Sequence, residues 1–255
     1  MDLKVDLEWG DEGVIPETIH PDTAFIFEKM GDVIQEMVAP DIGERVLDVG
    51  CGRAVDALAL AKRGAEAIGL DPSGRMMREA KNHSDNSDIH LVRGIGEALP
   101  FKKNSLDKII CKGALDHFID MSKTMADMSQ SLKPGGSAII AIANFESLSC
   151  HLGRSWFPIV KMFYRQQDGR HPWIPPDDHN YKFDCPRLKQ IVARDFDIEK
   201  MRGMSLLWTA PYWGKVLSLL PRRVSSAILA ALDRIARRFP SLSDVIIVKI
   251  TPKGA

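Results

Sequence analysis

The chain has 255 residues, enough for one substantial domain with smaller additions. Its 34 basic and 34 acidic side chains balance, which argues against a general nucleic-acid binder, and its hydrophobic content of 45% is typical of globular proteins. The acidic N-terminus lacks the apolar core of a secretory signal, and no apolar run approaches the roughly 20 residues that cross a bilayer, so we expect a cytoplasmic protein.

The cysteines are widely spaced and form no Cys-x-x-Cys pair, which favours reduced thiols and no metal cluster. They are Cys51, Cys111, Cys150 and Cys185.

Residues 1–39 are expected to form a loose arm followed by a helix. Asp22 can cap this helix over residues 23–38, and Pro40 ends it. Apolar residues recur there at helical spacing, namely Phe27, Met30, Ile34, Met37 and Val38.

Between residues 40 and 144, apolar runs alternate with helical patterns. The runs are RVLDV (45–49), AIGLD (67–71), IHLV (89–92), LDKIIC (106–111) and GSAIIAIA (136–143). The helix-like stretches lie near 54–63, 73–82 and 119–132. This alternation predicts a parallel sheet covered on both faces. The segment Pro134-Gly135-Gly136 predicts a sharp break before the fifth strand.

The rhythm is lost in residues 145–184, which are rich in aromatic residues and proline. We expect this segment to be an insertion that packs over the core as a lid. Residues 185–255 are expected to hold a helix and a strand (185–203), a mostly helical insertion (204–243) and a last strand (244–251).

The turn after the first strand contains Gly50 and Gly52. A dinucleotide-binding turn has a third glycine where this chain has Val55, and the Gly-Lys-Ser/Thr of a phosphate loop is missing. Asp48 would oppose a pyrophosphate and favour a cation, whereas Asp71 can accept hydrogen bonds from both hydroxyls of a ribose. These residues predict a nucleoside ligand with a cationic appendage, and S-adenosylmethionine fits this description.

Five segments together resemble the motifs of the class I S-adenosylmethionine-dependent methyltransferases. The resemblance is to the small-molecule branch that includes ubiquinone and menaquinone biosynthesis methyltransferases. The segments are VLDVGCGRA (46–54), IGLDPSGRMM (68–77), GIGEALPF (94–101), CKGALDHFID (111–120) and LKPGGSAIIAIAN (132–144). The chain departs from the family pattern at Ala54, where a third glycine is usual, and at Ile95, where many relatives have Asp or Asn.

This resemblance implies a Rossmann-like, doubly wound α/β fold. Its sheet would have seven mostly parallel strands with an antiparallel last strand, and helical and aromatic lid insertions would be added to it. It implies S-adenosylmethionine as cofactor, with S-adenosylhomocysteine as product. The implied cofactor-binding residues are Asp48, Gly50, Cys51, Gly52, Asp71, Pro72, Gly96, Glu97 and Lys112.

Several of these residues have a structural alternative. Asp71 could cap a helix in the sequence Asp-Pro-Ser, and Asp48 could cap backbone amides. Glu97 could be a solvated turn residue. Cys51 is interpreted as a small neutral filler.

Asp116 and His117 follow the fourth strand, where side chains point toward the transferred methyl group. His117 could act as a general base or orient the acceptor, or it could instead cap the next helix. A second group of residues matches no metal-ligand spacing, so we expect no metal. This group is His151, His171, His179, Asp177 and Asp178.

The implied reaction is in-line methyl transfer to an oxygen or carbon atom of a small, lipophilic metabolite. The segment Lys112-Gly113-Ala114-Leu115 stands where adenine methyltransferases of nucleic acids carry Asp/Asn-Pro-Pro-Tyr/Phe, so a nucleic-acid acceptor is disfavoured. Two alternatives remain, a cofactor-binding scaffold without catalysis and an NAD(P)-dependent oxidoreductase. Val55 and Asp48 disfavour the second.

Residues 222–238 form a basic amphipathic pattern, with an apolar stripe from Val224 to Ile235 flanked by arginines. Such a helix could make a peripheral contact with an anionic membrane, or it could be a lid helix with one solvated face.

Overall fold

The computed structural model describes residues 5–10, 18–84, 87–160, 173–174, 179–208 and 210–254. Within this part of the chain the strands form one seven-stranded sheet in the order β3-β2-β1-β4-β5-β7-β6. The strands are β1 (Arg45–Val49), β2 (Glu66–Asp71), β3 (Ile89–Arg93), β4 (Leu106–Lys112), β5 (Leu132–Ala143), β6 (Phe196–Met204) and β7 (Val245–Pro252). Only β7 runs antiparallel to its neighbours, which confirms the predicted fold class.

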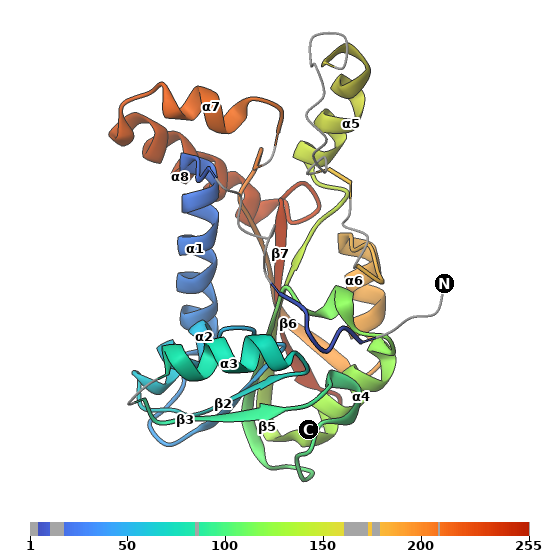
Figure 1. Cartoon of the computed structure of the whole chain (residues 1–255). Coiled ribbons are helices and arrows are strands. Elements are labelled where there is room, and N and C mark those ends of the chain that lie inside the picture. Colours follow the sequence, from blue (N-terminus) through green and yellow to red (C-terminus); the bar gives the residue numbers. More distant parts are fainter. Residues whose placement is uncertain are drawn as a thin grey trace.

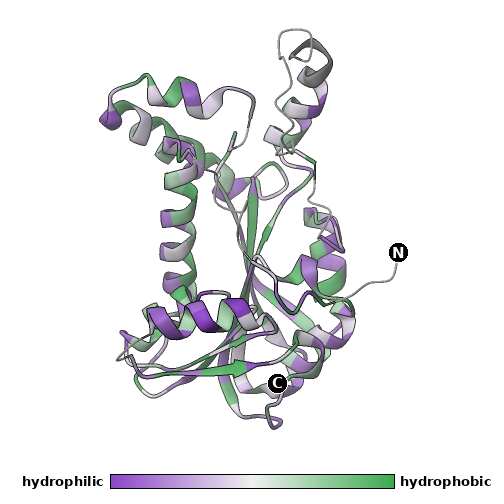
Figure 2. Ribbon diagram, viewed as in Figure 1, coloured by the Kyte–Doolittle hydropathy of each residue, from purple (hydrophilic) through white to green (hydrophobic). Residues whose placement is uncertain are grey.

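Helices cover both faces of the sheet (Figure 1). One face carries α1 (Pro21–Val38), α2 (Val55–Ala61) and α3 (Gly74–His83), and the other carries α4 (Met121–Ser131) and α6 (Cys185–Val192). Successive strand residues alternate between the two apolar cores, because side chains of a strand point to opposite faces. Val46, for example, belongs to the core that includes residues of α1, and Leu47 to the core that includes residues of α4. Figure 2 shows the central strands as mostly apolar ribbons.

Two insertions extend from the end of the sheet at which β5 finishes (Figure 1). The first contains α5 (Leu148–Val160), and the second contains α7 (Trp213–Ser218) and α8 (Arg222–Arg238). The backbone N–H of Leu148 donates to the carbonyl of Leu242, which joins the two insertions. None of the described helices is both long enough and apolar enough to cross a bilayer.

The first helix differs from its prediction. It begins at Pro21 rather than after Asp22, because His20 takes the extended N-cap conformation and proline is favoured in the first turn. Asp22 is buried inside the helix and is not its cap. Phe27 is 36% exposed, and the buried stripe uses Ile26 and Val33 instead.

The predicted break at Pro134-Gly135-Gly136 falls within β5 and not before it. The partner of Leu106 is Leu132, while the partner of Lys108 is Ser137, so the intervening residues bulge out of the ladder. Gly135 adopts a φ of 80°, which glycine tolerates without steric cost. The proline and glycines therefore do mark an irregularity at this place, but the irregularity is a bulge within the strand rather than a break before it.

A buried carboxylate at the start of β7 gives a testable pH dependence. Asp244 accepts hydrogen bonds from the Ser149 hydroxyl and the Trp208 backbone N–H. Burial raises its pKa from 3.8 to about 6. Since the folded state binds the proton more tightly than the unfolded state, the free energy of unfolding should fall as pH rises from about 4 to about 6, by as much as about 3 kcal/mol.

Chemical denaturation across this pH range should show a flatter pH profile for Asp244→Asn than for the parent chain. The exposed Asp88→Asn should leave the profile unchanged. Equal slopes for the parent and the Asp244 variant would contradict the assignment.

Candidate active site

The glycine turn between β1 and α2 is held tightly against two other segments. The backbone N–H groups of Gly50 and Cys51 both donate to the carbonyl of Leu70 at the end of β2. Gly50 has a φ of 72°, and a Cβ there would lie 2.3 Å from that of Ala114, so only glycine fits. At Gly52 the nearest atom to such a Cβ would be the sulfur of Met76, 4.0 Å away, so the turn is less crowded there than at Gly50.

Ala54 occupies the left-handed conformation, with a φ of 58°, at the start of α2. This explains physically why glycine is usual at this place. Alanine can adopt the conformation at a cost of roughly 1–2 kcal/mol. A β-branched residue would be excluded there.

Three buried carboxylates surround the turn, from Asp48, Asp56 and Asp71. Burial raises the pKa of Asp48 well above 3.8, and the charges of Asp56 and Asp71 raise it further. The ammonium group of Lys112 opposes this effect, but its direct ion-pair partner is Asp56. Lys112 therefore neutralises a carboxylate that sequence reasoning missed.

Asp71 ends β2 and connects two turns. Its two carboxylate oxygens accept the backbone N–H groups of Gly52 and Ser73, each at 2.9 Å. Burial raises the pKa of Asp71 in spite of these hydrogen bonds and the nearby charge of His117. Ser73, and not Asp71, caps α3 by accepting the N–H of Met76. Each carboxylate oxygen still has a lone pair for a ribose hydroxyl.

Cys51 behaves as the neutral filler that the sequence suggested. Burial and the neighbouring carboxylates of Asp48 and Asp71 raise the pKa of its thiol. A thiol with a raised pKa is a poor nucleophile and metal ligand at neutral pH. All four cysteines are free.

Glu97 is buried, so its interpretation as a solvated turn residue is wrong. Its carboxylate accepts the backbone N–H groups of Ile119 and Asp120, and thereby fixes the start of α4. The adjacent Gly96 packs closely, because a Cβ there would lie 3.0 Å from the ring of Phe118. The carbonyl of Pro72 accepts a hydrogen bond from Arg93.

Residues 5–10 of the N-terminal arm lie along the start of α3, so the prediction of a loose arm is wrong for this part. The N–H of Gly74 donates to the carbonyl of Leu7, and the hydroxyl of Ser73 donates to that of Trp9. The ring of Trp9 lies 5.7 Å from that of His117, edge to face. The arm thus contributes an aromatic wall beside the cofactor motif.

Asp116, His117 and His179 form a cluster beyond the end of β4. Nδ1 of His179 lies 2.8 Å from the buried carboxylate of Asp116, and Nε2 of His117 lies 4.0 Å from it. The two imidazole rings are 4.6 Å apart. His179 is held there by the next two residues, since the N–H groups of Asn180 and Tyr181 donate to the carbonyl of Asp116.

A carboxylate with two imidazoles is also a ligand set for divalent transition metals. One ligand atom from each residue lies within 4.8 Å of the others. Ligands of a tetrahedral zinc ion stand about 3.3 Å apart, so the 4.0 Å separation of Asp116 and His117 is too wide without adjustment. The close contact between Nδ1 of His179 and the carboxylate of Asp116 pairs the two side chains directly, without an intervening ion. His171, Asp177 and Asp178 lie outside the described residues, and His151 contacts Glu146 instead.

The aromatic insertion is only partly described. Trp173 is buried against Gly153 of α5, which supports a small lid core, whereas Trp156 on the same helix is 58% exposed.

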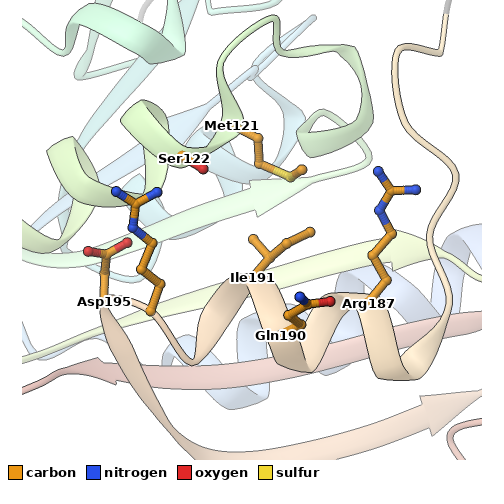
Figure 3. Close-up of a pocket in the computed structure, with 7 residues that line it drawn as sticks. Met121, Ser122, Arg187, Gln190, Ile191 and Asp195 are labelled. Atoms are coloured by element: carbon orange, nitrogen blue, oxygen red, sulfur yellow. The ribbon is translucent and has the colours of Figure 1, made fainter.

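A separate pocket of about 310 Å³ opens between α4 and α6 (Figure 3). Its lining includes none of the predicted site residues; it consists of Met121, Ser122, Arg187, Gln190, Ile191, Arg194 and Asp195.

The sheet order, the glycine turn and the two strand-end acids define a Rossmann-like nucleoside-binding protein. Its buried carboxylates favour a cationic ligand and oppose a phosphate. A family profile described as "Methyltransferase domain" matches residues 47–140. Demethylmenaquinone methyltransferase of Staphylococcus haemolyticus (strain JCSC1435) is 37% identical over 175 residues, which cover 64% of this chain and 73% of that protein. The chain belongs to the class I S-adenosylmethionine-dependent methyltransferases, in the branch of the ubiquinone and menaquinone biosynthesis enzymes.

The human mitochondrial ubiquinone biosynthesis O-methyltransferase is 30% identical over 182 residues. The match covers 68% of this chain and 47% of the human protein, so the chain spans about half the length of that relative. The solved structure of the PH0226 protein from Pyrococcus horikoshii OT3 matches with a TM-score of 0.60 at 14% identity, covering 96% of this chain and all of that one. The similarity to the PH0226 structure concerns the fold alone.

The residues present fit S-adenosylmethionine. Asp71 would accept hydrogen bonds from ribose hydroxyls, Gly52 would let the nucleoside approach the turn, and the buried carboxyl of Asp48 would suit a cationic methionine end. Because a bound cation favours ionised Asp48, affinity for S-adenosylmethionine should rise with pH through the raised pKa of that carboxyl, with net proton release. Calorimetry in two buffers of different ionisation enthalpy measures that release. An affinity and a proton count that do not change with pH would contradict this role of Asp48.

Proposed function

We propose that this chain methylates a hydroxyl oxygen of a small, lipophilic metabolite, with His179 as the general base. The observation that carries the proposal is the 2.8 Å contact between Nδ1 of His179 and the buried carboxylate of Asp116. A carboxylate this close favours the tautomer with its proton on Nδ1, and a small rotation of the ring would align the two groups; the carboxylate would then stabilise the imidazolium that forms when Nε2 accepts a proton. The sequence favoured His117 for this role, but the geometry favours His179.

The location of the pair supports this assignment. Asp116 follows β4 and comes two residues after Ala114. Since Ala114 packs directly on Gly50, this segment lies beside the glycine turn. A positive charge on His117 would lower the pKa of Asp71, the proposed ribose acid, which links the cluster electrostatically with the cofactor motif. A base in this position lies on the acceptor side of the motif.

Aromatic side chains around the cluster favour an apolar acceptor. The ring of Phe145 lies 5.7 Å from that of His179, and the ring of Trp9 lies 5.7 Å from that of His117. Such surroundings exclude water and hold a flat apolar molecule while a few polar groups orient it. A hydroxylated aromatic ring with an apolar tail matches this chemistry, in line with the quinone-biosynthesis relatives.

S-adenosylmethionine supplies an electrophilic methyl group on its sulfonium. The chain's own residues have the remaining tasks. Asp71 and Gly52 position the nucleoside, and the aromatic side chains exclude water. His179 takes the proton of the acceptor hydroxyl as the oxygen attacks, and Asp116 stabilises the resulting imidazolium.

The test uses S-adenosylmethionine labelled in its methyl group and a panel of prenylated catechols and hydroquinones. We expect label in an O-methylated product, identified by mass spectrometry of its fragments. Label on a ring carbon would contradict oxygen as the target. Cofactor binding without transfer to any phenol of the panel would favour the non-catalytic scaffold. Activity that a chelator abolishes and zinc restores would assign the cluster to a metal rather than to a base.

A further inference from the structure

Helix α8 (Arg222–Arg238) turns an apolar stripe toward solvent. Its buried face consists of Ser225, Leu229, Asp233 and Ala236. The stripe noted in the sequence lies elsewhere on the helix. Val224 and Ile235 are 44% and 48% exposed, and Ala227 and Ala231 between them are exposed as well. Two further stripe residues, Ile228 and Leu232, are half-buried, so the helix has one packed and one solvated face, and most of the stripe lies on the solvated side.

The apolar face continues beyond the helix. Phe239 follows Ile235 at the same four-residue spacing and is 52% exposed, and Leu242 in the next turn is 42% exposed. Isolated apolar side chains on a surface are ordinary, but a contiguous row of them marks a contact surface.

Positive charge borders this row. Three exposed arginines share one flank of α8, namely Arg223, Arg234 and Arg238. Arg234 and Arg238 follow Arg223 by eleven and fifteen residues, which is about three and four helical turns. None of the three forms an ion pair with a described residue. The one acid of the helix, Asp233, is buried against Arg202 and Arg237. The outer face of α8 thus carries positive charge and apolar surface without a compensating acid.

We propose that the outer face of α8, defined by Val224, Ala227, Ala231 and Ile235 with the flanking Arg223, Arg234 and Arg238, binds an anionic phospholipid surface. A basic amphipathic helix lies in the plane of such a surface, with its apolar side in the headgroup region and its arginines beside the phosphates. Nucleic acid would match the arginines but not the apolar row. A second copy of this chain would bring the same positive flank against itself.

The position of α8 fits this role. The turn that follows it is bonded to α5 through Leu242 and Leu148, at the end of the sheet where β5 finishes (Figures 1 and 2). Membrane contact at this end would bring the lid insertion toward a bilayer. The proposal does not depend on the reaction catalysed, since it follows from the exposed face alone.

The experiment is co-sedimentation of the full chain with lipid vesicles, without cofactor. We expect binding to phosphatidylcholine vesicles that contain about 30% phosphatidylglycerol, and loss of most binding without the anionic lipid or at about 0.5 M salt. Neutralising the basic flank should lower the partition coefficient at least about tenfold. The variant carries Arg223→Gln, Arg234→Gln and Arg238→Gln. The matched control removes three exposed lysines elsewhere, with Lys81→Gln, Lys102→Gln and Lys103→Gln, and should bind as the parent does.

The apolar row has its own matched pair of variants. Val224→Gln with Ile235→Gln should weaken binding, whereas Ile42→Gln with Ile198→Gln removes exposed apolar side chains elsewhere and should not. Equal binding of all variants, or no binding of the parent chain to anionic vesicles, would overturn the proposal. So would self-association in solution that the Val224 and Ile235 variant abolishes, because the face would then be a contact between copies. Cofactor affinity, measured on the same samples, reports separately on the proposed function.

Discussion

Replacing His179 with asparagine is expected to lower kcat about 10²-fold or more while leaving the affinity for S-adenosylmethionine close to that of the parent chain. The reason is that His179 lies beside Asp116 and the ring of Phe145, whereas the glycine turn is held by Asp71 and the carbonyl of Leu70. Loss of a positioned general base typically costs 10²–10⁴ in rate. Steady-state kinetics with the preferred acceptor and calorimetry with the cofactor measure the two effects.

The comparison with His117→Asn decides between the two imidazoles. His117 lies farther from Asp116, so its loss should affect kcat less. The parent chain should lose activity at low pH as the base becomes protonated, and this acid limb should disappear in His179→Asn but persist in His117→Asn. The reverse pattern would return the role to His117, as the sequence suggested. Full activity of both variants would remove general-base catalysis from the mechanism.

Replacing Asp71 with alanine is expected to weaken S-adenosylmethionine binding by about 1–3 kcal/mol, roughly ten- to hundredfold in Kd. The substitution removes the acceptors for the ribose hydroxyls. It also leaves the backbone N–H groups of Gly52 and Ser73 without their carboxylate partner. Isothermal titration with S-adenosylmethionine gives the Kd directly.

Asp71→Asn separates the two contributions. An amide keeps one acceptor oxygen but replaces the other with a donor, so one of the two backbone N–H groups faces a donor. We expect an intermediate loss of affinity and a measurable loss of stability. Unchanged affinity in both variants would contradict the ribose role of Asp71.

The cofactor half of the site could be read from the sequence because its signals are local. Asp48 and Asp71 each end a strand, and parallel neighbouring strands bring such ends to one edge of the sheet. Gly50 and Gly52 indicate the turn that follows the first of these strands. The strand alternation also predicted a parallel sheet covered on both faces, whereas the antiparallel last strand was implied by the resemblance to the methyltransferases.

The acceptor half could not be read in the same way because its contacts are long-range. His179 lies 2.8 Å from Asp116, although many residues separate them along the chain, and no local pattern connects the two. Trp9 reaches His117 from an arm whose composition indicated no structure. Asp56 was missed because an acid in the first turn of a helix is ordinary, and only the fold turns it toward Lys112.

The sequence also could not predict which face of α8 is exposed to solvent. The stripe from Val224 to Ile235 is apolar, and burial is the default expectation for such a stripe. In the structure α8 packs through a different face, on which Leu229 and Ala236 are buried and Asp233 lies 3.7 Å from Arg202 of β6.

Isothermal titration of the purified chain with S-adenosylmethionine, S-adenosylhomocysteine and NAD⁺ tests the cofactor assignment most directly. The buried carboxylates of Asp48 and Asp71 beside the glycine turn predict saturable binding of both adenosyl compounds and none of the dinucleotide. Binding of NAD⁺, or indifference to both adenosyl compounds, would contradict the assignment of this site.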